Sequence, residues 1–245
     1  MTRFSVSPLF ILCLLFISTG CATKYVLPGN RFISPESVGG NFKVQAELQQ
    51  TSAKLASIDV TGGSTNNKLI YSDKHRMGYF FGTSLMEQVD FIWYQTGGSV
   101  SFLGGRFQIM GGSKASKATG HKIAVTAALG GNEHEIDSGD PKIEFKMAGQ
   151  DFSVIHGYRF SENFLLYDSL SFTKINFDGD LKSNNPQFNG LEVNYNTKLI
   201  GLFLGTELSY GPVMAKLEAG YQLIQSNHTP DREGYRFGYS VGYNF

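Results

Sequence analysis

Histidine is the residue type in this chain best suited to acid–base chemistry. It occurs five times, at His75, His121, His134, His156 and His228. A hydrolase of the serine type needs a hydroxyl nucleophile beside a histidine base. Ser153 lies three residues before His156, and an odd offset on a strand puts the two side chains on opposite faces. The sequence therefore predicts no catalytic residue and a chain that is not an enzyme; the alternative is an envelope hydrolase acting on lipid or peptide.

Carboxylates gather in the stretch NEHEIDSGDP, residues 132–141. Calcium takes six to eight oxygen ligands, but the spacing here matches no defined calcium loop. We therefore expect a solvated loop, no metal and no cofactor. Four further carboxylates, Asp178, Asp180, Asp231 and Glu233, would have to meet at one rim to act as the carboxylates of a protease do, and no local pattern dictates that meeting.

The last eleven residues, 235–245, alternate strictly between two kinds of side chain. One face carries only apolar and aromatic residues, namely Phe237, Tyr239, Val241, Tyr243 and Phe245. The other face carries glycine and small polar residues together with Arg236. Such a strand suits lipid on its outer side and a narrow polar lumen on its inner side. A strand packed on a soluble core is the alternative, in the form of a lipid-anchored soluble β-sandwich.

Loop lengths along the rest of the chain alternate between short and long. Counting back from Phe245, short turns fall near residues 210 and 160, and long loops fall near 226, 178 and 131. This alternation is typical of an up-and-down barrel and is not expected of a sandwich. The count is ten strands, or twelve if the segments around Thr61 form an extra hairpin. We predict an all-β, closed antiparallel transmembrane barrel in which residues 41–49 pair with residues 235–245, with Val44 and Val241 both facing lipid.

These patterns resemble the broad class of small bacterial outer-membrane barrels with eight to twelve strands, across residues 41–245. The terminal Phe245 is similar to the C-terminal aromatic by which such barrels are recognised for insertion. The resemblance implies outer-membrane lipid and the barrel-assembly machinery as partners, and a monomer. It also implies that the carboxyl terminus is periplasmic and that the long loops, with any ligand they bind, are extracellular.

Charged residues fall on the predicted inner faces of several strands. These lumen charges are Lys43, Glu47, Glu207, Lys216, Glu218 and Arg236. Because both signs are present, we expect them to form a buried network of ion pairs that braces the wall; an ion-selective pore is the alternative. Aromatic residues near the predicted strand ends should anchor the barrel at the two membrane interfaces. They include Tyr158, Phe160, Phe164, Tyr210 and Tyr243 at one end, and Phe177, Tyr195 and Tyr235 at the other.

The amino terminus has the layout of an export signal. Arg3 precedes an apolar run over residues 9–17, and the sequence ISTGC then ends at Cys21. This ending resembles the lipobox of bacterial lipoproteins, which implies that residues 1–20 are removed and that Cys21 is lipidated; ordinary cleavage nearby is the alternative. Residues 21–40 have no period and contain proline and glycine, so they are expected to form a linker.

Composition supports this assignment and excludes one class of partner. The 21 basic residues equal the 21 acidic residues, and no basic patch is present, so nucleic acid is not an expected partner. Charged residues make up 17% of the chain, below the roughly 25% of typical soluble domains. The expected role is that of a non-enzymatic outer-membrane (lipo)protein of the Gram-negative envelope, acting through surface loops, envelope structure or a narrow channel.

Overall fold

The computed structural model describes most of the chain from residue 24 onward. The described residues are 24–40, 42–59, 68–136, 142–182, 184, 186, 189–190, 192–227 and 229–245. The expected signal peptide, Cys21, and residues 137–141 of the acidic stretch therefore lie outside the described residues, as does His228.

The described residues form eleven strands. They are β1 (Lys24–Leu27), β2 (Val44–Asp59), β3 (Lys68–Met86), β4 (Val89–Thr96), β5 (Ser101–Met110), β6 (Gly120–Ile136), β7 (Lys142–Ser161), β8 (Phe164–Lys182), β9 (Glu192–Tyr210), β10 (Val213–Ser226) and β11 (Thr229–Asn244). None of the described residues forms a helix of the length and apolar character needed to cross a membrane.

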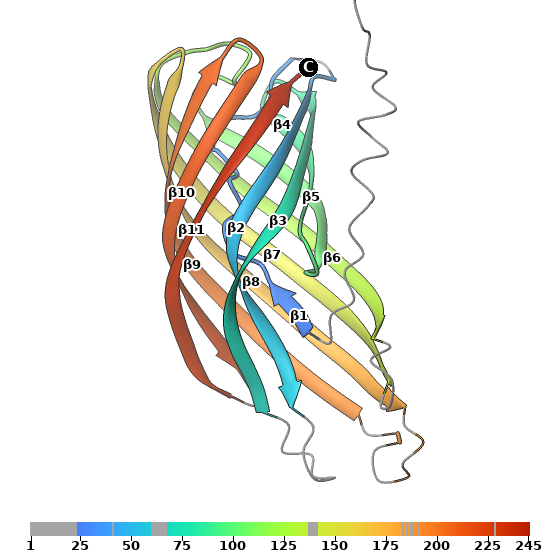
Figure 1. Cartoon of the computed structure of the whole chain (residues 1–245). Coiled ribbons are helices and arrows are strands. Elements are labelled where there is room, and N and C mark those ends of the chain that lie inside the picture. Colours follow the sequence, from blue (N-terminus) through green and yellow to red (C-terminus); the bar gives the residue numbers. More distant parts are fainter. Residues whose placement is uncertain are drawn as a thin grey trace, which may run out of the picture.

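Strands β2 to β11 form a closed antiparallel barrel of ten strands (Figure 1), which confirms the predicted fold class. The ring closes between the first and last of them, where Leu48 of β2 lies opposite Val241 of β11. The segments on either side of Thr61 extend β2 and β3, which pair from Val44 opposite Thr83 to Asp59 opposite Lys68. The ten-strand count therefore holds and the extra hairpin does not form.

The two ends of the barrel differ in their connections. Short turns at residues 87–88, 162–163 and 211–212 lie at the same end as Phe245, which we call the C-terminal end. The opposite end, which we call the loop end, carries the connections between β2 and β3, β6 and β7, β8 and β9, and β10 and β11. Strands β4 and β5 have only 8 and 10 residues, so their hairpin stops short of the loop end (Figure 1).

Side chains alternate between an apolar outer wall and a filled lumen, as the period of two requires. The outer wall exposes large apolar side chains such as Leu202 (62%), Leu204 (57%) and Phe237 (56%). The five outward residues expected on the last strand, Phe237, Tyr239, Val241, Tyr243 and Phe245, are all exposed there. Val44 lies on the same outer face of β2 as Leu48 and is half-buried.

The amino-terminal segment, residues 24–40, lies inside the barrel (Figure 1). Strand β1 pairs antiparallel with β2, from Lys24 opposite Ser57 to Leu27 opposite Lys54, toward the loop end. The chain then runs along the lumen to Gly40, whose carbonyl accepts a hydrogen bond from Ser84 at the C-terminal end. The sequence predicts a linker here, but the structure makes this segment the content of the lumen, and we call it the plug.

Candidate functional site in the barrel lumen

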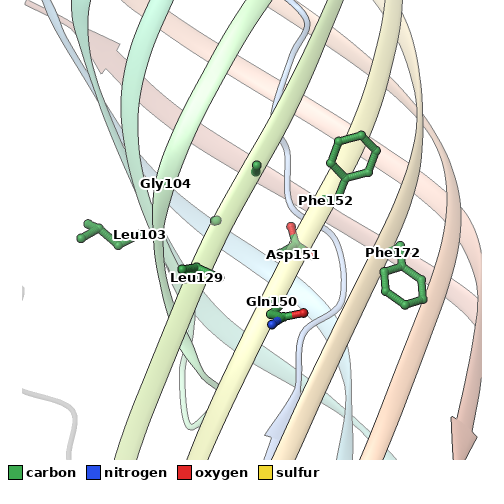
Figure 2. A pocket seen from close by; sticks show the side chains of 9 residues that line it. Leu103, Gly104, Leu129, Gln150, Asp151, Phe152 and Phe172 are labelled. Atoms are coloured by element: carbon green, nitrogen blue, oxygen red, sulfur yellow. The ribbon is translucent and has the colours of Figure 1, made fainter.

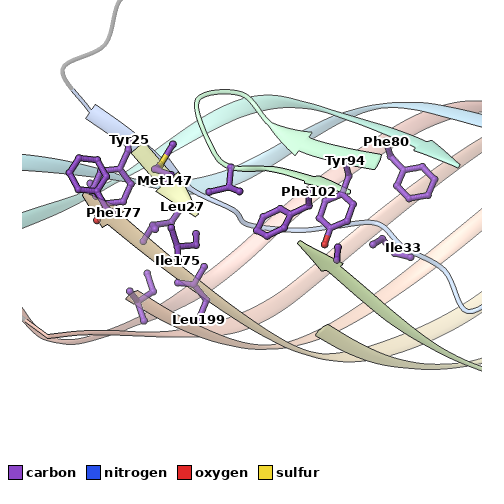
Figure 3. Close-up of a cluster of buried hydrophobic side chains, with 14 of the residues drawn as sticks. Tyr25, Leu27, Ile33, Phe80, Tyr94, Phe102, Met147, Ile175, Phe177 and Leu199 are labelled. Carbon is purple, nitrogen blue, oxygen red and sulfur yellow. The ribbon is translucent and has the colours of Figure 1, made fainter. Parts of the chain in front are cut away.

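Apolar contacts hold the plug in the half of the lumen nearest the loop end. Tyr25 and Leu27 are buried in a cluster that includes inward side chains of β7, β8 and β9 (Figure 3). The Tyr25 ring stacks on Phe177, with centroids 4.9 Å apart and planes at 24°. Phe177 and Tyr195 are therefore lumen residues, not the outer interface aromatics expected from the sequence, because they fall on the inward face of β8 and β9.

An ion pair between plug and wall follows in the middle of the lumen. The guanidinium of Arg31 donates to both carboxylate oxygens of Asp151 on β7, at 2.7 and 3.0 Å. It also donates to Ser171 at 2.9 Å and to Thr173, both on β8. Tyr94 donates its hydroxyl hydrogen to the same carboxylate. Both charges are buried, so this bidentate geometry with additional hydrogen bonds is what their burial requires.

A second ion pair, of opposite polarity, lies nearer the C-terminal end. Glu36 of the plug accepts from Arg159 of β7 at 2.7 Å, and Lys122 of β6 lies 3.4 Å away. Here the plug supplies the carboxylate and the wall supplies the cations. Because Arg31 and Glu36 are opposite in sign and each meets its complement, the plug is held in one register along the lumen.

Backbone groups of the plug are also bound by wall side chains. Asp90 accepts from the Val38 amide at 3.0 Å while receiving the Nε–H of Arg106 at 2.8 Å. Arg106 in turn donates to the Ser34 carbonyl at 3.2 Å, and Gln108 accepts from the Ser37 amide at 2.8 Å. These bonds satisfy backbone groups that would otherwise be buried without partners, which is costly.

Phe32 gives the plug a sharp turn within the lumen. Its φ is +55°, a conformation that bulky residues rarely adopt. The turn points its carbonyl at Lys216, whose ammonium donates at 2.6 Å. Its ring lies against Gly238 of β11, where an added Cβ would come within 2.6 Å of the ring. The glycine on the inner face of the last strand therefore makes room for the plug.

Five of the six predicted lumen charges are buried inside the barrel: Glu47, Glu207, Lys216, Glu218 and Arg236. Lys216 pairs with Glu47, and Glu207 pairs with Lys114 at 2.6 Å. Lys43 differs, because β2 begins at Val44 and this side chain is exposed at the C-terminal end.

The plug leaves the lumen beside the turn between β3 and β4. The carboxylate of Glu87 in this turn accepts from the Ser113 hydroxyl and from the Gly40 amide, the latter at 3.0 Å. These hydrogen bonds to the charged form, the Ser113 bond first, lower the pKa of Glu87 below its usual value. A charged carboxylate therefore fixes the end of the plug to the barrel.

The wall residues that bind the plug are not among the lumen charges predicted from the sequence. Asp90, Arg106, Lys122, Asp151 and Arg159 all lie on inward positions of strands, but their partners, residues 30–38, show no period. The plug itself carries a pattern that could indicate a buried segment with charged anchors. Arg31 and Glu36 flank the apolar pair Phe32 and Ile33 in a stretch otherwise rich in small residues.

The candidate catalytic groups are not brought together. Ser153 faces the lumen, where its hydroxyl contacts Thr126, while His156 is exposed on the outer wall, so the two lie on opposite faces. The exposed residues Asp178 and Asp180 lie on β8, which β9 and β10 separate from β11 with Asp231 and Glu233. His75 is also exposed, and the side chain of His134 lies outside the described part. Within the described ranges, no three His, Cys, Asp or Glu side chains are grouped as a metal site.

Comparisons with known proteins give likenesses of architecture alone. No family model matches the chain, and no curated protein matches it. One similar solved structure is Ail, the attachment invasion locus protein of Yersinia pestis, at 11% identity and a TM-score of 0.40, covering 84% of this chain and 100% of that one. Another is the outer membrane protease OmpT from Escherichia coli, at 8% identity and a TM-score of 0.43, covering 86% and 100%. A third, Neisserial surface protein A, has 13% identity and a TM-score of 0.35, covering 84% and 97%. The barrel assignment rests on the strand pairing and does not depend on these likenesses.

Proposed function

We propose that this protein is a non-enzymatic outer-membrane β-barrel whose lumen is closed by its own plug. Its role then lies on its surface, in envelope structure or in binding by the loops at the loop end. The observation that carries the proposal is the paired set of buried charges, Arg31 with Asp151 and Glu36 with Arg159, which locks residues 24–40 inside an apolar-walled barrel.

The outer wall supports placement in a membrane. Leu208 (57%), Leu217 (53%) and Val241 (53%) are among the many large apolar side chains that point outward on neighbouring strands. A continuous exposed apolar surface of this kind is unfavourable in water and suits lipid. By the usual topology of such barrels, the C-terminal end is periplasmic and the loop end is extracellular.

The filled lumen argues against a channel. A conducting path needs water and mobile ions along the barrel axis, but the plug occupies the axis from Tyr25 to Val38 with buried side chains. The wall charges that would attract ions, such as Asp151 and Arg159, are already neutralised by the plug. We therefore expect the intact protein not to conduct.

Planar-bilayer recording tests this closure. The purified full chain should give no conductance steps above noise, whereas a variant lacking residues 24–40 should give discrete steps, because removal leaves a polar, charged lumen. If the deletion variant does not fold, the double substitution R31A/E36A should still raise the frequency of openings, since it unpairs both anchors. A matched control is Lys117→Ala, an exposed lysine outside the lumen. Steps from the intact protein as frequent as those from the deletion variant would contradict the proposal.

A further inference from the structure

The apolar outer wall ends before the strands do on the side of the loop end. On β5 to β8, the outward large apolar residues nearest the loop end are Leu103, Leu129, Phe152 and Phe172 (Figure 2). The next outward side chains toward the loop end are polar or small, such as Gln150 on β7 and Lys174 on β8. In the membrane placement proposed above, the edge of the hydrocarbon region therefore falls near these four apolar side chains.

The amino end of the plug lies beyond this edge. Tyr25 stacks on Phe177 inside the lumen, and Phe177 follows Phe172 on β8 toward the loop end. Because a strand rises about 3.3 Å per residue, this contact is on the loop-end side of the apolar band. The plug ends at the C-terminal end, where the Gly40 amide donates to Glu87. Residues 24–40 therefore cross the whole apolar band inside the barrel.

This crossing changes which sides of the membrane the two chain ends occupy. The barrel strands β2 to β11 begin and end at the C-terminal end, at Val44 and Asn244. The plug adds one more crossing ahead of them, and its strand β1 runs antiparallel to β2 with Lys24 opposite Ser57. Lys24 and Phe245 therefore lie at opposite ends of the barrel.

The barrel wall is short where the plug reaches the loop end. β3 begins at Lys68 but pairs with β4 only from Gly78 onward. Among the described residues, no strand lies between β3 and β6 beyond the turn that joins β4 and β5 (Figure 1). The plug meets this turn directly, because the Val26 amide donates to the Gly98 carbonyl at 3.1 Å. Trp93 lies on the outer face of β4 near the turn, as suits the level of the headgroups.

We propose that the chain ahead of Lys24 leaves the lumen over the β4–β5 turn and is displayed on the loop-end side of the membrane. This side is the extracellular face in the orientation given under the proposed function, on which the inference rests. The acyl group expected on Cys21 is three residues from Lys24, a distance of at most about 11 Å. It therefore enters the outer leaflet from the cell surface, and the carboxyl terminus stays on the periplasmic side.

The buried anchors of the plug keep its amino end on this side. Withdrawing Lys24 to the C-terminal end would separate Arg31 from Asp151 and Glu36 from Arg159. Each separation leaves buried charges without their partners, which is strongly destabilising. We therefore expect the barrel to close around the plug during assembly, with the amino terminus already at the loop end.

Cysteine labelling of the full chain on intact cells tests the location. Thr23→Cys places a thiol next to Lys24, Asp180→Cys places an exposed thiol at the loop end, and Asn163→Cys places one in a turn at the C-terminal end. A polyethylene glycol maleimide too large to cross the outer membrane should react with T23C and D180C on whole cells. It should react with N163C only after the outer membrane is permeabilised. The unsubstituted chain gives the background.

The outcomes separate this inference from the proposed function. A T23C variant that reacts only after permeabilisation, as N163C does, would overturn the inference and leave the proposed function standing. D180C and N163C variants that react alike would instead contradict the membrane orientation itself. If the reagent does not reach T23C under either condition, an epitope inserted after Thr23 decides. Antibody staining on whole cells is expected, and staining only after permeabilisation would overturn the inference.

A disulfide tests the exit beside the β4–β5 turn. A Cβ added at Gly98 would lie 3.8 Å from the Val26 Cβ, which is the usual separation in a disulfide. The V26C/G98C variant should therefore form an internal disulfide under mild oxidation. The matched control V26C/G211C uses another turn glycine with positive φ, at the C-terminal end, and should form none. Folded V26C/G98C protein, recognised by heat-modifiable migration, that cross-links no more than this control would overturn the proposed exit.

Discussion

Arg31 shows how much one buried residue of the plug depends on the wall. Its guanidinium donates two hydrogen bonds to Asp151 and one each to Ser171 and Thr173. All three partners lie more than a hundred positions further along the chain. A buried ion pair of this kind stabilises the folded protein little more than apolar packing would. Removing one partner is strongly destabilising, because it leaves the other charge buried and uncompensated.

The residue-scale prediction concerns that asymmetry. Asp151→Asn should lower the free energy of unfolding by about 3–5 kcal/mol, because Arg31 stays buried without its anion. The double variant R31M/D151M should lie much closer to the wild type. The measurement is denaturant unfolding in lipid vesicles followed by the fluorescence of Trp93, with the exposed Asp180→Asn as control. A D151N variant as stable as that control would contradict the role given to the pair.

At the scale of elements, the plug behaves as an internal strand-and-coil segment fixed at both ends. Strand β1 adds to β2 at positions 54–57, beyond residues 45–51 where β2 pairs with β11. It therefore covers the part of the β2 edge from which β11 has separated, and an uncovered strand edge is unfavourable in a membrane barrel. At the other end the plug is held by Gly40 and the turn that carries Glu87.

The element-scale prediction is a pH dependence of that second attachment. The pKa of Glu87 is depressed in the folded protein, so its contribution is fully present above the ordinary glutamate value of about 4.3 and is lost as the pH falls through the lower folded value. Amide hydrogen exchange at residues 37–40, corrected for intrinsic rates, should therefore speed up between pH 6 and about pH 3. Glu87→Gln should abolish most of this change. An equal acceleration in E87Q would assign the effect to other carboxylates.

For the whole molecule, closure between β2 and β11 removes the open edges that a flat sheet would have. The ring closes by pairing residues 45–51 with residues 238–244. Side chains alternate between the outer and inner faces of every strand around the ring, which gives the apolar wall and the filled lumen. A closed barrel of this kind resists detergent until it is heated, because no single strand can leave without breaking two ladders.

The molecule-scale prediction concerns the location of the protein in the outer membrane and the processing of its amino terminus. The protein should fractionate with the outer membrane, resist carbonate extraction and migrate differently on a gel before and after boiling. The mass of its amino-terminal peptide in the same samples should show acylated Cys21 as the first residue. Extraction as a soluble or merely tethered protein would contradict the membrane barrel, and an unacylated terminus would contradict the lipoprotein signal alone.

Two expectations fail: Phe177 and Tyr195 face the lumen, and the connection near residue 226 consists of residues 227–228 alone. The sequence by itself nevertheless determined the ten-stranded antiparallel barrel and the outward faces of most strands, because alternation is a local property that can be read without knowing a strand's partners. It also placed Glu47, Glu207, Lys216, Glu218 and Arg236 inward, since a strand position has only two faces. Only the tertiary structure decided what fills the lumen. The plug has no period, its anchors meet residues such as Asp151, which is 120 positions from Arg31, and its fit depends on contacts across the barrel. The hydrogen-bonded contacts of His156 with His121 and Asp168 likewise exist only because three neighbouring strands adopt one register, which no single strand's sequence specifies.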